Sequence, residues 1–231
     1  MTTGGGRFGL RAGRFGAALA VATAASVMVG CAASAPSDRT GAPEASVGRA
    51  LGTFAAVGDS ITDADSRDFA TGDLGPASWA TYVVDDGFVF TGGWAEWGAT
   101  TERMAQSVAP VEADALVVLA GTNDLAFGVP FEESAANLDR IVDAVGIGDV
   151  LVVSIPPMDA YPDGVTEYNE RLDDLADDRG WRFVDASAGL RTLDGRFVEG
   201  MSSDGLHPSE EGARVLGTAI AAAIAAELRA G

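Results

Sequence analysis

From residue 51 onward, short apolar runs alternate with segments in which apolar residues recur at helical spacing. The apolar runs predict buried strands at 53–57, 88–91, 115–120, 150–155 and 181–185. The periodic segments predict helices at 76–85, 100–108, 131–145, 165–179 and 208–229. This alternation is typical of a parallel sheet covered by helices on both faces. Ligands bind at the carboxyl ends of the strands in such folds, so functional residues are expected just after each strand.

The first 30 residues follow a different pattern, that of a secretory signal peptide. Residues 1–14 carry three arginines and no acid, and residues 15–30 form an apolar run. That run is shorter than the roughly 20 residues that a membrane-spanning helix needs. A basic segment followed by a short apolar segment therefore predicts a cleaved leader at 1–30 and a protein that acts outside the cytoplasm.

Cys31 follows the apolar run directly, and Met28-Val29-Gly30-Cys31 resembles the lipobox of bacterial lipoproteins. If the resemblance holds, cleavage precedes Cys31 and its thiol carries a lipid. Ala33-Ser34-Ala35 offers the alternative of an ordinary secretory cleavage site, which would remove Cys31 with the leader. Residues 31–50 are rich in Ala, Ser, Pro and Gly and predict a flexible, lipid-anchored linker to a domain at 51–231.

Composition and charge exclude several classes of function. The 231 residues include one cysteine and one histidine, which rules out an intrachain disulfide and a zinc site built from these residue types. The formal net charge is −19, and the arginine-rich leader is its most basic part. An acidic surface repels phosphate backbones and anionic head groups, so we expect no nucleic-acid partner and no polyanionic substrate. Contact with the membrane is expected only through the lipid anchor.

Three residues at the ends of predicted elements suggest nucleophilic catalysis. Ser60 follows the first strand, and His207 precedes the last helix, with Asp204 three residues before it. A serine hydroxyl needs a neighbouring base, and the only histidine can supply one near neutral pH. Asp204 would hold the imidazole through Nδ1 and leave Nε2 facing the serine. Pro208 suits the first turn of a helix, which would fix His207 at the helix entrance.

A tetrahedral intermediate also needs hydrogen-bond donors for its oxyanion. The backbone N–H groups of Ser60 and Gly98 and the side-chain amide of Asn123 are the candidates. Glycine at position 98 would let the backbone approach a ligand closely, although Gly92 and Gly93 lie nearby and keep this assignment open.

The sequence resembles the SGNH (or GDSL) hydrolase superfamily in four blocks. These are Val57-Gly58-Asp59-Ser60-Ile61-Thr62, Gly98-Ala99-Thr100-Thr101, Gly121-Thr122-Asn123-Asp124 and Asp204-Gly205-Leu206-His207-Pro208, in the family's order across 53–229. The resemblance implies a three-layer α/β/α sandwich of flavodoxin type with a parallel five-stranded sheet. It also implies hydrolysis of acyl esters or thioesters without a cofactor or metal. The residues around Ser60 do not match the G-x-S-x-G elbow of the α/β-hydrolases.

Each candidate also has a structural interpretation. Ser60 would cap the following helix, Asn123 would occupy a left-handed turn, Gly98 would start a helix, and Asp204 and His207 would form a surface pair. Asp63, Asp65 and Asp68 suggest either a cation site or, more simply, a solvated loop. Five aromatic residues flank the site blocks and would line a substrate pocket or the core: Trp79, Trp94, Trp97, Phe127 and Tyr161.

The leading functional hypothesis is hydrolysis of acetyl or short-chain acyl esters of a carbohydrate or small molecule. The same residues would serve a lipase or an acyltransferase that moves the acyl group to a sugar hydroxyl. From another class, the protein would be an inert envelope lipoprotein that binds glycan on a degenerate hydrolase fold. The sequence does not indicate an oligomeric state.

Overall fold

A computed structural model describes residues 50–230 and contains one five-stranded sheet. Its strands are β1 (Thr53–Gly58), β2 (Val89–Ala95), β3 (Ala115–Leu119), β4 (Val150–Val153) and β5 (Arg182–Val184). Every neighbouring pair is parallel, and the strand order is β2-β1-β3-β4-β5. This is the flavodoxin order, and it confirms the predicted fold class. The predicted leader, Cys31 and nearly all of the predicted linker lie outside the described residues.

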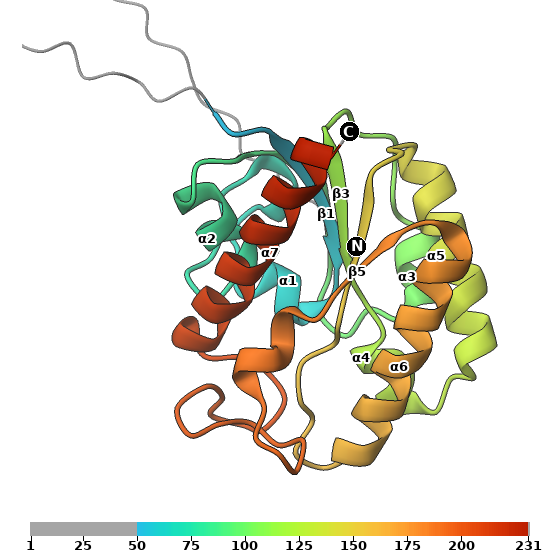
Figure 1. Cartoon of the computed structure of the whole chain (residues 1–231), viewed down its shortest axis with the longest axis vertical. Coiled ribbons are helices and arrows are strands. Elements are labelled where there is room, and N and C mark those ends of the chain that lie inside the picture. Colours follow the sequence, from blue (N-terminus) through green and yellow to red (C-terminus); the bar gives the residue numbers. More distant parts are fainter. Residues whose placement is uncertain (1–49, 231) are drawn as a thin grey trace, which may run out of the picture. The chain divides into compact units, whose positions relative to one another are not determined.

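Helices cover both faces of the sheet (Figure 1). Helices α2 (Trp79–Asp85) and α7 (Glu210–Ala230) pack on one face, where Phe54 of β1 meets Trp79 and Ile220 in one apolar cluster. Helices α3 (Thr101–Ala105), α5 (Phe131–Val145) and α6 (Pro162–Arg179) pack on the other face. Successive residues of β1 point to opposite faces of the sheet, so both layers form around the same strand.

The second strand is longer than the sequence predicts, because its backbone pairing continues through Gly92 and Gly93 to Ala95. A β-carbon on Gly93 would lie 1.9 Å from the Ala56 carbonyl oxygen, so only glycine fits between β1 and β2 here. The glycines interrupt the apolar pattern but not the strand. The loop that carries Trp97 and Gly98 therefore begins after residue 95, at the carboxyl edge of the sheet.

Helix α7 begins at Glu210, two residues after the predicted start, and Pro208 precedes the helix. The Ser209 hydroxyl accepts a hydrogen bond from the Gly212 N–H at 3.2 Å and caps the first turn. Pro208 therefore does not occupy the first turn as expected, although it follows His207 directly and is buried.

Four short helical segments were not predicted: α1 (Ser60–Asp63), η1 (Phe69–Thr71), α4 (Thr122–Phe127) and η2 (Ala186–Leu190). Segments this short hold too few apolar residues to show a helical period. Both α1 and α4 follow a strand within a few residues, and each carries a predicted site residue in its first turn. Within residues 50–230, no helix combines the length and the apolar character needed to cross a membrane.

Candidate active site

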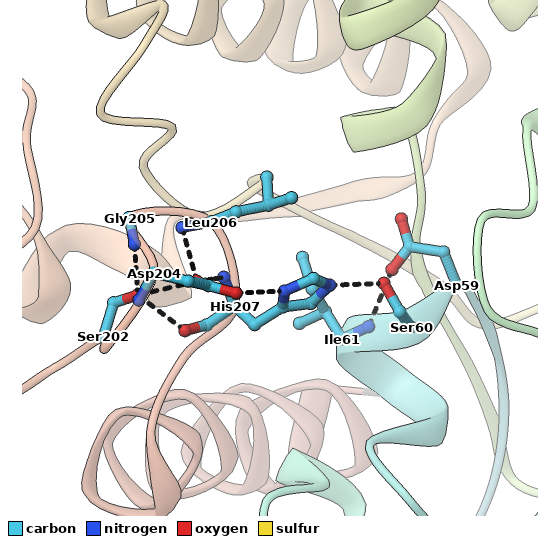
Figure 2. A network of polar contacts seen from close by, with 8 residues as sticks. All are labelled: Asp59, Ser60, Ile61, Ser202, Asp204, Gly205, Leu206 and His207. Carbon is cyan, nitrogen blue, oxygen red and sulfur yellow. Dashed lines mark hydrogen bonds and ion pairs between the residues drawn. The ribbon is translucent and has the colours of Figure 1, made fainter.

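Ser60 is the first residue of α1, at the carboxyl end of β1. The residue that caps this helix is Asp59, whose Oδ1 accepts a hydrogen bond from the Ile61 N–H at 2.9 Å. The interpretation of Ser60 as the helix cap is therefore wrong, and its hydroxyl is engaged elsewhere. The Ser60 Oγ lies 2.9 Å from Nε2 of His207, a residue 147 positions away in the chain (Figure 2).

His207 lies in the loop before α7 and is held on its other side by Asp204 (Figure 2). Its Nδ1 lies 2.8 Å from Asp204 Oδ2. A carboxylate accepts hydrogen bonds, so this contact assigns the ring proton to Nδ1 and leaves the lone pair of Nε2 for the Ser60 hydroxyl. The structure thus brings Ser60, His207 and Asp204 into one hydrogen-bonded chain.

The backbone around Asp204 fixes its carboxylate as well. The N–H groups of Leu206 and His207 donate to Asp204 Oδ1 at 2.9 and 2.8 Å. Partial burial acts to raise the pKa of Asp204, but the hydrogen bonds from His207 and Leu206 outweigh it and lower the pKa below its usual range. Asp204 therefore stays ionised beside the imidazole across the pH range of most enzymes.

Two residues that the sequence did not single out hold this loop. The Ser202 hydroxyl donates to the His207 carbonyl oxygen at 2.7 Å and accepts from the Gly205 N–H at 3.0 Å. Asp159, in the loop after β4, donates its backbone N–H to the Gly205 carbonyl and accepts from the Phe197 N–H, both at 2.9 Å. Only the folded chain brings Asp159 to this loop, so sequence spacing gave no signal for it.

Asn123 lies in the first turn of α4, directly beyond the end of β3. Its Nδ2 donates to the Ala99 carbonyl oxygen at 3.0 Å and to Asp59 Oδ2 at 3.3 Å. Asn123 is helical and does not adopt the left-handed conformation of the turn interpretation. Both amide hydrogens already have acceptors, so Asn123 must release one of them before it donates to a ligand.

Gly98 is exposed and has a positive φ of 72°. A β-carbon at this position would contact nothing within 4 Å, so the backbone conformation and not crowding favours glycine here. Gly98 lies three residues before α3, in a turn closed by the hydrogen bond from the Ala99 N–H to the Glu96 carbonyl oxygen, which is compatible with its interpretation as a turn residue at the start of the helix.

Asp59 is fully buried beside Ser60 and accepts hydrogen bonds at both carboxylate oxygens. Burial raises its pKa to about 7, while the hydrogen bond from Ile61 and the nearby His207 act to lower it and Asp124 acts to raise it further. A buried carboxyl group with a pKa near neutrality is a common feature of functional sites. The Gly-Asp-Ser block draws attention to Asp59 in the sequence, but it does not indicate that this aspartate is buried or what it does.

Asp124, the last residue of the Gly-Thr-Asn-Asp block, has a structural role. It is fully buried and accepts from the Thr101 N–H at 2.9 Å, from the Thr101 hydroxyl at 2.5 Å and from the Ser134 hydroxyl at 2.8 Å. These bonds join α4 to the first residue of α3 and to α5. Asp124 thereby fixes the helix that carries Asn123 against the loop that carries Gly98.

The five flanking aromatic residues divide between core and surface. Trp79 is fully buried and donates its Nε1–H to Thr62 Oγ1 at 3.0 Å, and Trp94 packs partly buried on the other face of the sheet. Trp97, Phe127 and Tyr161 are exposed. Of these, Trp97 contacts the predicted site directly, because its ring centroid lies 5.2 Å from that of His207.

The acidic loop after α1 is held by its own hydrogen bonds. Asp68 Oδ1 accepts from the Thr71 N–H at 3.3 Å, and Arg67 pairs with Asp73 at 3.0 Å. Between residues 50 and 230 there is no group of three or more His, Cys, Asp or Glu side chains able to hold a metal ion. The predicted cation-site alternative at Asp63, Asp65 and Asp68 therefore finds no support in the described part of the chain.

Fold and site together define an ester hydrolase of the SGNH class. The sequence matches the family model described as GDSL-like Lipase/Acylhydrolase over residues 56–215, and the chain belongs to this family. Within a flavodoxin-like sheet, the four blocks noted in the sequence lie at the carboxyl edge. The protein is therefore an ester hydrolase.

Solved structures with the same fold share little sequence with this chain. A protein from Streptococcus pneumonia, described as a platelet activating factor, is 19% identical with a TM-score of 0.59, over 78% of this chain and 86% of that one. A lipolytic protein of the G-D-S-L family from Desulfitobacterium hafniense is 17% identical with a TM-score of 0.59, over 74% and 98%. A catalytic mutant of an acetylxylan esterase from Geobacillus stearothermophilus is 19% identical with a TM-score of 0.58, over 76% and 94%. No curated protein matches the chain significantly.

Proposed function

We propose that the protein cleaves acyl esters through a covalent acyl-enzyme on Ser60, with His207 as general base and acid. The observation that carries this proposal is the 2.9 Å contact between the Ser60 hydroxyl and His207 Nε2. The 2.8 Å contact of Nδ1 with an ionised Asp204 supports it, because a carboxylate stabilises the imidazolium that forms during the reaction.

In the first half of the reaction, Ser60 Oγ attacks the ester carbonyl carbon while its proton passes to His207 Nε2. The tetrahedral intermediate then collapses, and the carbon–oxygen bond to the alcohol breaks. His207 returns its proton to the departing alcohol oxygen, which leaves an acyl group on Ser60. In the second half, water gives a proton to Nε2 and attacks the acyl carbonyl. The bond between the acyl carbon and Ser60 Oγ then breaks, His207 returns the proton to Oγ, and the acid and the free serine are released.

The oxyanion would accept hydrogen bonds from the backbone N–H groups of Ser60 and Gly98 and from Asn123 Nδ2. The longer of the two Asn123 bonds, at 3.3 Å to Asp59, is the one we expect the amide to exchange for the oxyanion. Hydrogen bonds in free enzymes often tighten or change partner only when the reacting group is bound. The positive φ of Gly98 would set the direction in which its N–H points.

The substrate that we propose is an acetyl or short-chain acyl ester of a neutral carbohydrate or small molecule. A net charge of −19 disfavours anionic substrates and leaves neutral ones unaffected. One structural neighbour is an acetylxylan esterase and another is described as lipolytic. Likeness of fold therefore does not distinguish a carbohydrate ester from a lipid as the substrate of this protein.

A series of p-nitrophenyl esters from acetate to palmitate tests this proposal. We expect the highest kcat/KM for acetate and a steady fall with chain length. Ser60→Ala should lower activity on every ester to near background, whereas Ser203→Ala, an exposed serine in the His207 loop, should keep it. Full activity in purified Ser60→Ala protein would refute the mechanism, and a maximum at palmitate would refute the substrate class.

We further propose that the domain is exported and anchored through a lipid on Cys31. The basic start, the apolar run and the lipobox-like residues before Cys31 support this. Labelling of cells with radioactive palmitate should mark the wild-type protein and not Cys31→Ser. Equal labelling of both would contradict the anchor, and an unprocessed wild-type protein in the cytoplasm would contradict export.

A further inference from the structure

Three exposed aromatic side chains lie beyond the carboxyl ends of three strands. Trp97 follows β2, Phe127 ends α4 after β3, and Tyr161 precedes α6 after β4. This is the edge of the sheet that carries Ser60. Large aromatic side chains are usually buried, so an exposed one that also contacts a site residue suggests a surface that a ligand covers.

Trp97 differs from the other two because it contacts the imidazole of His207. The ring centroids are 5.2 Å apart, and the planes are inclined by 33°. Trp97 is 51% exposed, so the imidazole covers only part of the indole. The indole therefore lies against the imidazole on one side and leaves about half of its surface open.

The chemistry of the reaction determines which part of a substrate reaches this indole. His207 Nε2 must return its proton to the alcohol oxygen, which places that oxygen within about 3 Å of Nε2. The carbon skeleton of the alcohol is attached to that oxygen, whereas the acyl chain is attached to the carbonyl carbon that Ser60 holds. A ring joined to the alcohol oxygen therefore lies within van der Waals reach of Trp97.

We propose that Trp97 forms a subsite for the alcohol part of the ester and binds the ring of a neutral pyranose by stacking. This inference rests on the proposed function of Ser60 and His207 and adds the identity of the group that leaves. The C–H face of a pyranose packs against an indole face through apolar contact. The acidic net charge of −19 favours a neutral alcohol over an anionic one at this subsite.

The test compares two acetate esters with different alcohols, ethyl acetate and a monoacetylated methyl pyranoside. Both form the same acetyl-enzyme, so a change in the ratio of their kcat/KM values between wild type and a variant reports contacts made by the alcohol up to acylation. We expect Trp97→Ala to lower kcat/KM for the pyranoside about tenfold and to change that for ethyl acetate by less than about twofold. Trp97→Phe should restore most of the ratio, and Phe127→Ala, the matched exposed aromatic, should leave it unchanged.

The outcomes separate this inference from the proposed function. An equal loss on both esters in Trp97→Ala would mean that the indole only supports His207, and unchanged kcat/KM values for both esters would mean that the alcohol does not contact it. Either result overturns the inference while the mechanism on Ser60 stands. A wild-type protein that hydrolyses neither ester, with the same background as Ser60→Ala, would overturn both.

Discussion

Asp59 and Asn123 meet next to Ser60, and their contact shows how much of the site depends on single polar atoms. The carboxylate caps α1 through Oδ1 and accepts from the Asn123 amide through Oδ2. One buried side chain therefore orients both the helix that begins at Ser60 and the proposed oxyanion donor. The two residues make separate predictions, one for turnover and one for stability.

Removal of the Asn123 amide is expected to slow the reaction without unfolding the protein. Loss of one oxyanion donor typically lowers turnover by ~10² to 10³. Asn123→Ala should show this fall in kcat for p-nitrophenyl acetate, with an unchanged far-UV circular dichroism spectrum. An Asn123→Ala variant with wild-type kcat would remove Asn123 from the oxyanion site.

The buried carboxyl group of Asp59 is expected to make stability depend on pH. Its pKa is raised from 3.8 to about 7 in the folded state, so the folded protein binds more protons than the unfolded chain between these values. Stability should therefore fall as pH rises from 4 to 8, by an amount on the order of a few kcal/mol for this group alone. Urea unfolding of wild type and Asp59→Asn at each pH measures the difference in their free energies of unfolding. The variant should become more stable relative to wild type as the pH rises.

Asp114→Asn is a control with the opposite sign. Hydrogen bonds from the Thr53 side chain and backbone lower the pKa of Asp114, so its contribution is present at neutral pH and is lost on acidification. In the same urea series, the free energy of unfolding of Asp114→Asn should therefore be lower than that of wild type at pH 7, and the difference should shrink in acid. A pH-independent difference between wild type and Asp59→Asn would contradict the assignment for Asp59.

Among single residues, the sequence predicted those that carry recognisable chemistry and missed those whose role depends on burial. A single histidine left one candidate base, and the Asp-x-x-His spacing allowed Asp204 to turn back onto the ring. Asp159 is an ordinary aspartate in the sequence, and the Gly-Asp-Ser block does not indicate what Asp59 does. Their importance follows from burial and from contacts 38 to 64 residues away, which local spacing does not reveal.

Among the elements, the loop from η2 to α7 is the one on which the proposed mechanism depends most. It carries Asp204 and His207 and is tied to the loop after β4 through Asp159. A catalytic group must be held within about half an ångström of its productive position, so supporting contacts of this kind affect the rate.

Asp159→Ala should therefore lower kcat without abolishing activity. The substitution removes the acceptor for the Phe197 N–H and leaves the backbone bond to Gly205 in place. We expect a fall of about tenfold in kcat and faster amide hydrogen exchange in residues 196–207. Asp163→Ala, an exposed acid in the first turn of α6, is the matched control and should change neither. Unchanged exchange in Asp159→Ala would show that the loop is held by other contacts.

The long elements were predictable because each buries a regular apolar pattern. Helix α5 has the predicted bounds, and all five strands were found to within a few residues. The short helices α1 and α4 were not found, because segments of four and six residues are too short to show a helical period. These short helices carry Ser60 and Asn123, so the least predictable elements are those that form the candidate site.

For the molecule as a whole, the order β2-β1-β3-β4-β5 brings together blocks separated by up to 147 residues. The carboxyl ends of parallel strands joined by crossover helices all lie at one edge of the sheet, and α1 meets the loop before α7 there. Alternation of apolar runs was enough to predict this edge, while the distance between Ser60 and His207 required the folded structure.

Covalent labelling with a fluorophosphonate, followed by mass spectrometry of peptides, tests the central claim most directly. The probe reacts with serine hydroxyls that a neighbouring base activates. We predict one adduct per chain on the peptide that contains Ser60, none in Ser60→Ala, and labelling slowed by at least about a hundredfold in His207→Ala. An adduct on any other serine, or undiminished labelling without the imidazole, would contradict the account.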